Sequence, residues 1–242
     1  GEAKLLSNKK IAIKSTSENI EINADEIIIA TGSYPKSIPG FNFDKKFIVS
    51  SDDIWNIPNI PKSLLVIGSG PIGIEFARVF HVLGSKVTIA EIKEKICPVL
   101  DTEISENLTR SLKRRGISLK PNNASKFIRI ENNSVTVEFL STVDGNKETN
   151  QFDMVLVAVG REPKKKNLGL ENAQVELVPG GFVKVNPHLQ TNVKNIWAIG
   201  DITDYPQLAH TASFQARVVA SNISGRETQF NGGVIPSCIF GY

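Results

Sequence analysis

The sequence has little cysteine and little histidine, and this excludes several classes of protein. It contains two cysteines, Cys97 and Cys238, and three histidines, His81, His188 and His210. Two cysteines so far apart in the chain make no disulfide framework, and they fit a reducing compartment. Neither cysteine has a second ligand at the usual metal-binding spacing, and the histidines are scattered. The sequence therefore predicts no metal site.

Long apolar runs and a strong excess of charge are also missing. No apolar run approaches the roughly 20 residues of a membrane-spanning helix. The net charge is only +3, and the one basic run, Lys164–Lys166, follows Pro163 in a predicted solvated loop. We therefore expect neither a nucleic acid nor a membrane as a partner. The 242 residues, 40% of them hydrophobic and 22% charged, suffice for one or two globular domains.

A glycine-rich turn between an apolar run and a helical pattern is the most informative feature that is present. Residues 64–67 are apolar and include the β-branched Val66 and Ile67, as in a strand buried on both faces. Gly68 permits a tight turn, Gly70 permits close approach of a pyrophosphate, and Gly73 permits close packing of the following helix. The helix N-terminus offers free N–H groups to phosphates. A second strand follows and ends at Glu91, the acid of the dinucleotide-binding fingerprint.

The acid at the end of the second strand indicates which nicotinamide cofactor binds. A carboxylate at Glu91 accepts hydrogen bonds from ribose hydroxyls and repels a ribose phosphate, so it favours NAD over NADP. Lys93 and Lys95 follow closely. They either reach a phosphate or, as we favour, are solvated loop charges paired with Glu94.

Three further apolar runs also end at glycine, at residues 27–32, 155–160 and 196–200. In open parallel sheets, ligands lie at the carboxyl ends of the strands, where a glycine lets the backbone approach them. The alternative interpretation is a strand that simply leads into a turn. The recurrence favours an α/β fold with ligands at several strand ends.

The remaining patterns predict a helix and several antiparallel strands. A helix is expected over 101–115, capped by Asp101 and ended by Gly116. Short alternating strands are expected at 11–13 and 20–22, and a longer one at 135–139 within a hairpin or meander.

These motifs together resemble a known family. Ala30-Thr31-Gly32, the fingerprint from Gly68 to Glu75, Val159-Gly160-Arg161-x-Pro163 and Ala198-x-Gly200-Asp201 occur in an order that resembles the flavoprotein disulfide reductases with two dinucleotide folds. Within that family the segments 207–210 and 235–237 are similar to those of the dihydrolipoyl dehydrogenases. The resemblance covers essentially the whole chain. It implies a Rossmann-like, doubly wound NAD-binding domain, a parallel sheet plus an antiparallel meander, inserted in part of an FAD-binding domain. The expected boundaries are 1–60 for partial FAD-binding domain, 61–160 for NAD-binding domain, and 161–242 for the return to the FAD-binding domain.

The resemblance also implies roles for particular residues, none of them catalytic. NAD is expected at the fingerprint residues, with Glu75 near the nicotinamide unless it is an ordinary helix carboxylate, and Asp201 is expected to accept a hydrogen bond from FAD or to cap a helix. The NAD-binding set is Gly68, Ser69, Gly70, Pro71, Ile72, Gly73, Ile74, Glu75 and Glu91, with Gly160 close by. The FAD-binding set is Thr31, Gly32, Ser33, Asp201, Gln207, Leu208, Ala209 and His210.

Two parts of the family's pattern do not occur in this sequence. One is the first glycine fingerprint with its Cys-x4-Cys redox pair, and the other is the dimerisation domain with its His–Glu pair. We therefore interpret the chain as an internal piece with an incomplete FAD site, predicted inactive alone. The resemblance implies a homodimeric parent, in the bacterial cytoplasm or the mitochondrial matrix, that oxidises dihydrolipoamide on the lipoyl domain of a 2-oxoacid dehydrogenase complex or the glycine cleavage system. Alternatives are another flavoprotein disulfide reductase such as a mercuric reductase, an NADH oxidase or peroxidase, or a nucleotide-binding module without turnover.

Overall fold

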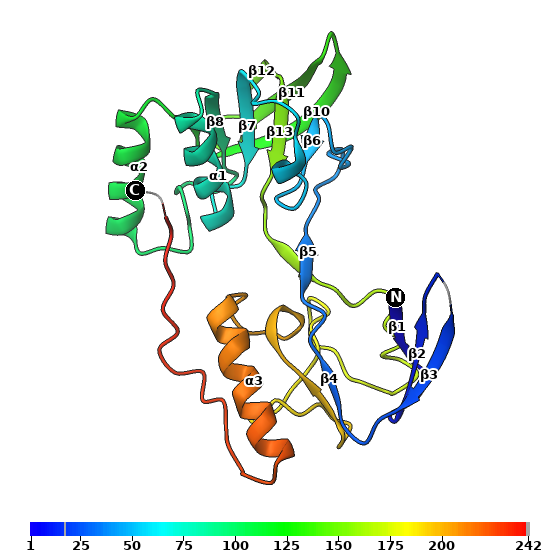
Figure 1. The fold of residues 1–242 in the computed structure, drawn as a ribbon. Coiled ribbons are helices and arrows are strands. Elements are labelled where there is room, and N and C mark those ends of the chain that lie inside the picture. Colours follow the sequence, from blue (N-terminus) through cyan, green and yellow to red (C-terminus); the bar gives the residue numbers. More distant parts are fainter. Residues whose placement is uncertain (17, 241–242) are drawn as a thin grey trace. The chain divides into compact units, whose positions relative to one another are not determined.

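The chain folds into two compact units, which we call unit 1 and unit 2 (Figure 1). The structure is a computed structural model, and it describes residues 1–16 and 18–240. Unit 1 joins Gly1–Tyr34 with Glu162–Pro236. Unit 2 joins Pro35–Arg161 with the segment that begins at Ser237. Each unit is described here by itself.

Unit 2 is built around a five-stranded parallel sheet in the order β6-β13-β7-β8-β9. Its strands are β6 (Ile48–Val49), β7 (Ser63–Ile67), β8 (Lys86–Ala90), β9 (Ser118–Lys120) and β13 (Met154–Val157). The register pairs Ile67 at the end of β7 with Ala90 at the end of β8. The glycine turn after β7 and the acid after β8 therefore come to one edge of the sheet.

The strands of this sheet are buried on both faces, as the apolar run at 64–67 predicts. Leu64 and Val66 of β7 belong to a core shared with helices α1 (Pro71–Val82) and α2 (Thr102–Arg114). Leu65 and Ile67, one residue further on in each case, belong to a second core. That core is shared with an antiparallel meander of β10 (Asn123–Glu131), β11 (Ser134–Ser141) and β12 (Lys147–Phe152). Figure 1 shows the helices on one side of the sheet and the meander on the other.

The helix boundaries follow their local signals. α1 begins with Pro71 directly after Gly70, and the chain turns at Gly84, whose φ is +98°. α2 starts as predicted, because the Asp101 side chain accepts a hydrogen bond from the Glu103 N–H at 2.9 Å.

Unit 1 holds an antiparallel sheet, a parallel strand pair and one long helix. The antiparallel sheet consists of β1 (Glu2–Leu5), β2 (Lys10–Lys14) and β3 (Asn19–Asn23). The parallel pair consists of β4 (Ile27–Ile29) and β15 (Ile196–Ala198). The helix is α3 (Ala209–Ile223), and a 3-10 turn, η2 (Gly200–Ile202), follows β15. In unit 2 a second 3-10 turn, η1 (Ile54–Asn56), precedes β7. The strands β5 (Ser33–Pro35) and β14 (Arg161–Pro163) form a two-stranded sheet.

The first unit boundary differs from the expected one. Residues 35–60 pack with unit 2, whereas we expected the FAD-binding part to extend to residue 60. The reason is that Ile48 and Val49 of β6 pair with β13 on the edge of the parallel sheet, and Phe41 and Ile54 are buried in the two cores of unit 2. The second boundary, at 161/162, lies one residue from the expected position. The end of the chain from Ser237 groups with unit 2 rather than with the expected third segment.

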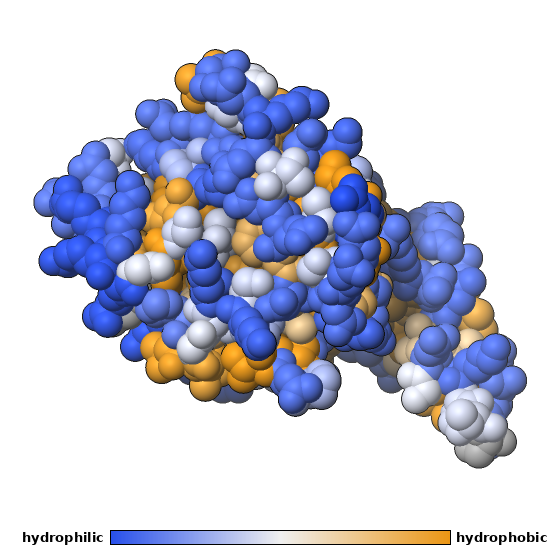
Figure 2. Space-filling model, turned by 90° about the horizontal axis from the view of Figure 1, so that it is seen from above, coloured by the Kyte–Doolittle hydropathy of each residue, from blue (hydrophilic) through white to orange (hydrophobic). Residues whose placement is uncertain are grey.

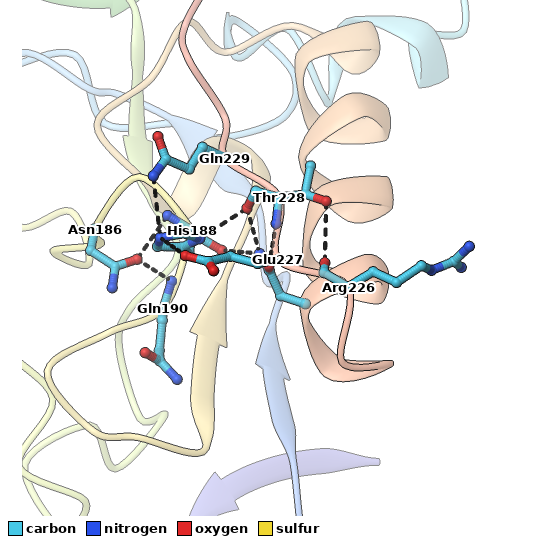
Figure 3. A network of polar contacts seen from close by, with 8 residues as sticks. Asn186, His188, Gln190, Arg226, Glu227, Thr228 and Gln229 are labelled. Atoms are coloured by element: carbon cyan, nitrogen blue, oxygen red, sulfur yellow. Dashed lines mark hydrogen bonds and ion pairs between the residues drawn. The ribbon is translucent and has the colours of Figure 1, made fainter.

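A polar network in unit 1 holds the segment that follows α3 (Figure 3). The Asn186 side chain accepts hydrogen bonds from the N–H groups of His188 and Gln190, at 2.9 and 3.1 Å. His188 Nδ1 lies 3.0 Å from the Thr228 carbonyl, and the Asn222 side-chain amide donates to the same carbonyl at 2.9 Å. The chain after α3 is thereby fastened to the turn at 186–190.

The surface drawn in Figure 2 is mainly hydrophilic, with separate apolar patches between the polar side chains. Within the part of the chain that the structure describes, no helix combines the length and the apolar character needed to cross a membrane.

Candidate nucleotide-binding site

The carboxyl ends of β7, β8 and β13 open on a cavity of about 680 Å³ in unit 2. The glycine turn, the residues after β8 and the start of β10 form its walls. Six of the residues predicted to bind NAD line this cavity. They are Gly68, Gly70, Pro71, Ile72, Glu91 and Gly160. The cavity therefore lies where open parallel sheets hold their ligands.

The three glycines of the turn have different physical reasons to be glycine. Gly68 has a φ of +100°, and a Cβ there would lie 2.5 Å from the Ala158 carbonyl oxygen. A Cβ on Gly73 would lie 2.1 Å from the Gly68 carbonyl oxygen. Both findings confirm the tight turn and the close helix packing that we expected. A Cβ on Gly70 would meet no atom within 4 Å, so this glycine leaves space at the cavity instead of solving a packing conflict.

Glu91 is buried, with 8% of its surface exposed, and both of its carboxylate oxygens are hydrogen-bonded. Oε2 accepts from the backbone N–H of Ser69 at 2.9 Å and from the Ser69 hydroxyl at 2.7 Å. Oε1 accepts from the backbone N–H of Lys93 at 2.9 Å. The carboxylate is thus fixed at the cavity wall before any ligand binds. The sequence indicated Glu91, but it did not reveal that the Ser69 side chain holds this carboxylate. The one signal in the sequence was a hydroxyl residue between two glycines of the motif.

Cys97 lies beneath this acid and is fully buried. Its backbone N–H donates to the Ser69 hydroxyl at 2.9 Å. Burial, and secondarily the negative charge of Glu91, raise the pKa of the Cys97 thiol from 9.0 to about 11. The thiol therefore stays protonated at neutral pH and is a poor nucleophile.

Four residues of the predicted NAD-binding set do not line the cavity: Ser69 and Gly73 of the glycine turn, and Ile74 and Glu75 of α1. Ile74 is fully buried in the core between the sheet and the helices. Glu75 lines a second cavity of about 460 Å³ with Trp55 and Phe240. There Glu75 Oε1 accepts a hydrogen bond from the Phe240 N–H at 3.0 Å, and Arg78 donates to the Phe240 carbonyl at 3.2 Å. The expected contact of Glu75 with a nicotinamide stays a prediction.

In unit 1 the structure brings together predicted FAD-binding residues from both ends of the chain. The Ser33 hydroxyl donates to Asp201 Oδ2 at 2.6 Å. The Thr31 hydroxyl donates to the Lys164 carbonyl at 2.9 Å. Asp201 lies inside the 3-10 turn η2, whose N-cap is Ile199. Its alternative role as a helix N-cap is therefore wrong.

The other predicted FAD-binding residues stand at the start of α3, beside polar atoms that lack partners. Leu208 is the N-cap of α3, and Ala209 and the exposed His210 form its first turn. Of the five buried side-chain atoms that have no hydrogen-bond partner among the described residues, three belong to this part of unit 1. They are Gln207 Nε2, Thr211 Oγ1 and Gln215 Nε2. Such groups cost free energy when unpaired, so this place fits a polar ligand such as FAD.

No cluster of three metal-binding side chains occurs in the residues described by the structure. The described residues likewise hold two free cysteines, Cys97 and Cys238. The candidate site therefore consists of hydrogen-bonding groups, a fixed carboxylate and a glycine turn.

Comparison with known proteins identifies a family that matches this chain. The pyridine nucleotide-disulphide oxidoreductase family matches residues 2–216. Dihydrolipoyl dehydrogenase from Chlamydia pneumoniae is 38% identical over 240 residues, which is 99% of this chain and 50% of that protein. Dihydrolipoyl dehydrogenase from Bacillus subtilis is 36% identical over 241 residues, 99% of this chain and 51% of that protein.

Solved structures agree with these matches. LpdA from Mycobacterium tuberculosis superposes with a TM-score of 0.86 and 26% identity, over 96% of this chain and 50% of that one. The HOCl-induced flavoprotein disulfide reductase RclA from Escherichia coli gives a TM-score of 0.84 and 28% identity, over 96% of this chain and 52% of that one. The chain spans about half the length of the curated relatives it matches. Proteins of this family use FAD and NAD(P). The chain belongs to the pyridine nucleotide-disulphide oxidoreductase family.

Proposed function

We propose that this chain is the nucleotide-binding part of a disulfide oxidoreductase of the dihydrolipoyl dehydrogenase type. Unit 2 binds NAD in the cavity at the ends of β7 and β8. Unit 1 supplies part of an FAD site around Ser33, Asp201 and the start of α3. The proposal is supported by the family match and by the names of the curated relatives.

One observation carries the NAD assignment. Glu91 is fixed at the wall of the cavity, and the glycine turn stands beside it with open space at Gly70. A buried carboxylate accepts hydrogen bonds from ribose hydroxyls, whereas a ribose phosphate would place a second negative charge against it. The N-terminus of α1 offers its free N–H groups and the positive end of its dipole to the pyrophosphate. Lys93 also lines the cavity, and its charge is available to the pyrophosphate.

The FAD assignment is supported by the residues of unit 1. Asp201 is held by the Ser33 hydroxyl and can accept a further hydrogen bond. The unpaired buried atoms near the start of α3 suit a ligand with several polar groups. When bound, FAD would supply electron transfer between a disulfide and the nicotinamide cofactor.

For the whole protein we propose that it oxidises dihydrolipoamide carried on the lipoyl domain of a 2-oxoacid dehydrogenase complex or of the glycine cleavage system, and that it works as a homodimer. The likeness to RclA supports a second candidate, a flavoprotein disulfide reductase with another substrate. The two candidates share the nucleotide sites and differ in the dithiol or disulfide that reacts.

Calorimetric titration of the protein with NADH and with NADPH tests the NAD assignment. We expect NADH to bind at least about tenfold more tightly, a difference of about 1.4 kcal/mol, because of the fixed carboxylate of Glu91. Titration of the protein with buffer alone serves as the blank. Binding of NADPH as tight as that of NADH would contradict the assignment.

A further inference from the structure

Ser69 stands between the two glycines of the turn, and its side chain is completely buried. Its backbone N–H and its hydroxyl both donate to Oε2 of Glu91, at 2.9 and 2.7 Å. The same hydroxyl accepts the backbone N–H of Cys97 at 2.9 Å. One small side chain therefore joins the glycine turn, the acid after β8 and the loop before α2.

The direction of these hydrogen bonds is fixed by chemistry. An ionised carboxylate can only accept, so the Ser69 hydroxyl must donate its single proton to Glu91. The lone pairs of that hydroxyl are then left for the N–H of Cys97. Two donors from Ser69 fill Oε2. Among the described residues Oε1 accepts only from Lys93, which leaves it one acceptor position for a ligand.

The hydrogen bond between the Ser69 hydroxyl and Cys97 also links Ser69 to another wall of the cavity. Cys97 has a φ of +51°, a conformation that side-chain-bearing residues rarely adopt, and the Ser69 hydroxyl holds its N–H. Pro98 and Val99, the next two residues, line the cavity. The hydroxyl that orients the acid therefore also anchors the apolar wall beside it.

We infer that Ser69 is a positioning residue that sets the preference for a free ribose 2′-hydroxyl over a 2′-phosphate, by holding the Glu91 carboxylate in one place. This inference rests on the NAD-binding function proposed above. A carboxylate held in advance loses no side-chain entropy when it binds a hydroxyl, and it cannot turn away from a phosphate. Without the Ser69 hydroxyl the Glu91 carboxylate is free to move. It should then bind the ribose hydroxyl less tightly and discriminate less against a 2′-phosphate.

The test compares two probes without a nicotinamide, ADP-ribose and 2′-phospho-ADP-ribose, so that Glu75 plays no part. Calorimetry on Ser69→Ala should show about tenfold weaker binding of ADP-ribose, the worth of one hydrogen bond to a charged group. Binding of the phosphorylated probe should change little, so the preference should fall about tenfold. Ser69→Cys keeps a side chain of similar shape but offers only a weak S–H donor, and it should behave alike if Ser69→Ala folds poorly.

The matched control is Ser85→Ala. Ser85 is also buried, and its hydroxyl donates to the Pro61 carbonyl at 2.6 Å, at the opposite end of β8 from Glu91. This change should leave the preference between the probes unaltered. A double-mutant cycle with Glu91→Gln separates positioning from a general structural effect. If Ser69 acts through Glu91, then Ser69→Ala should lower the preference little further once Glu91→Gln is present.

Two results would overturn the inference while leaving NAD binding intact. One is an unchanged preference in both Ser69 variants, and the other is an equal fall in preference with and without Glu91→Gln. A parent protein that binds neither probe, or that prefers the phosphorylated one, would instead refute the proposed function itself, and the inference with it.

Discussion

The environment of a single side chain decides how the two cysteines behave. Cys97 is fully buried beside Glu91, and burial with that negative charge raises the pKa of its thiol to about 11. Cys238 is exposed. Because the thiolate is the reactive form, the two residues should differ in their reaction with alkylating agents.

We expect iodoacetamide at pH 8 to modify Cys238 quickly and Cys97 only on unfolding. Mass spectrometry of peptides over time measures both rates. The variant Cys238→Ser should lose the fast reaction and leave the protein unlabelled. Rapid labelling of Cys97 in the folded protein would contradict its placement in the core.

The same pKa shift has a consequence for stability at high pH. The folded protein keeps the Cys97 proton up to about pH 11, whereas the unfolded chain releases it near pH 9.0. The contribution to the free energy of unfolding is therefore present below pH 9 and is lost as the pH rises toward 11. Urea titrations at pH 8 and pH 10.5 should show a smaller loss of stability in Cys97→Ala than in the parent protein.

At the scale of the element, two glycines of the strand–turn–helix unit formed by β7 and α1 have different roles. Gly73 is needed for packing, and we propose that Gly70 is needed for binding. A side chain at Gly73 would press against the Gly68 carbonyl, whereas one at Gly70 would enter open space. Gly70 has an ordinary backbone conformation, with φ −67°. The same change to alanine can be made at both positions, so the two variants form a matched pair.

We expect Gly73→Ala to destabilise the protein by about 1–3 kcal/mol, because the helix must move off the strand to relieve the contact. Gly70→Ala should leave the melting temperature nearly unchanged and weaken NADH binding, because the methyl group lies where the pyrophosphate would come close. Thermal unfolding and calorimetry on both variants check this. Equal stability of the two variants would contradict the division of roles.

Elements were predicted well where the signals are local. Helix α2 carries its own cap at Asp101 and its own stop at Gly116, so its position is found from the sequence to within one residue. Strand β7 ends in a continuous apolar run, residues 64–67, that pattern alone identifies. By contrast, β6 is a two-residue strand that pairs with β13, more than 100 residues later. No local signal reports such a pairing, and this is why the first unit boundary was misplaced.

In the candidate site, too, the features with a local signal could be predicted and those that depend on long-range packing could not. Gly68, Gly70 and Glu91 could be identified because their spacing is a motif. The Ser69–Glu91 hydrogen bond and the contact of Glu75 with Phe240 could not, since each depends on how distant segments pack. The resemblance to relatives implied Ser33 and Asp201 as neighbours of one cofactor, but their mutual hydrogen bond is visible only in the fold.

At the scale of the whole molecule, the cysteines determine which chemistry the 242 residues can perform. Transfer of electrons from a dithiol needs a thiolate nucleophile with a base in reach. Cys97 is buried and protonated, and it faces a carboxylate that disfavours its ionisation. The sequence contains no second cysteine at the spacing of a redox pair. We therefore expect the chain to bind a nucleotide without catalysing turnover.

We expect the 242-residue protein to bind NADH yet to show no lipoamide-dependent NADH oxidation, even with FAD added in excess. It should also retain little FAD on purification, because the sequence has only one glycine fingerprint, and NAD would occupy it. Absorbance at 340 nm follows NADH, and the flavin band follows FAD. The Bacillus subtilis relative, assayed in the same buffer, is the positive control. Turnover by this chain that disappears in Cys97→Ser would contradict both the protonated state of that thiol and the assignment of its role, because a buried neutral thiol cannot start the exchange.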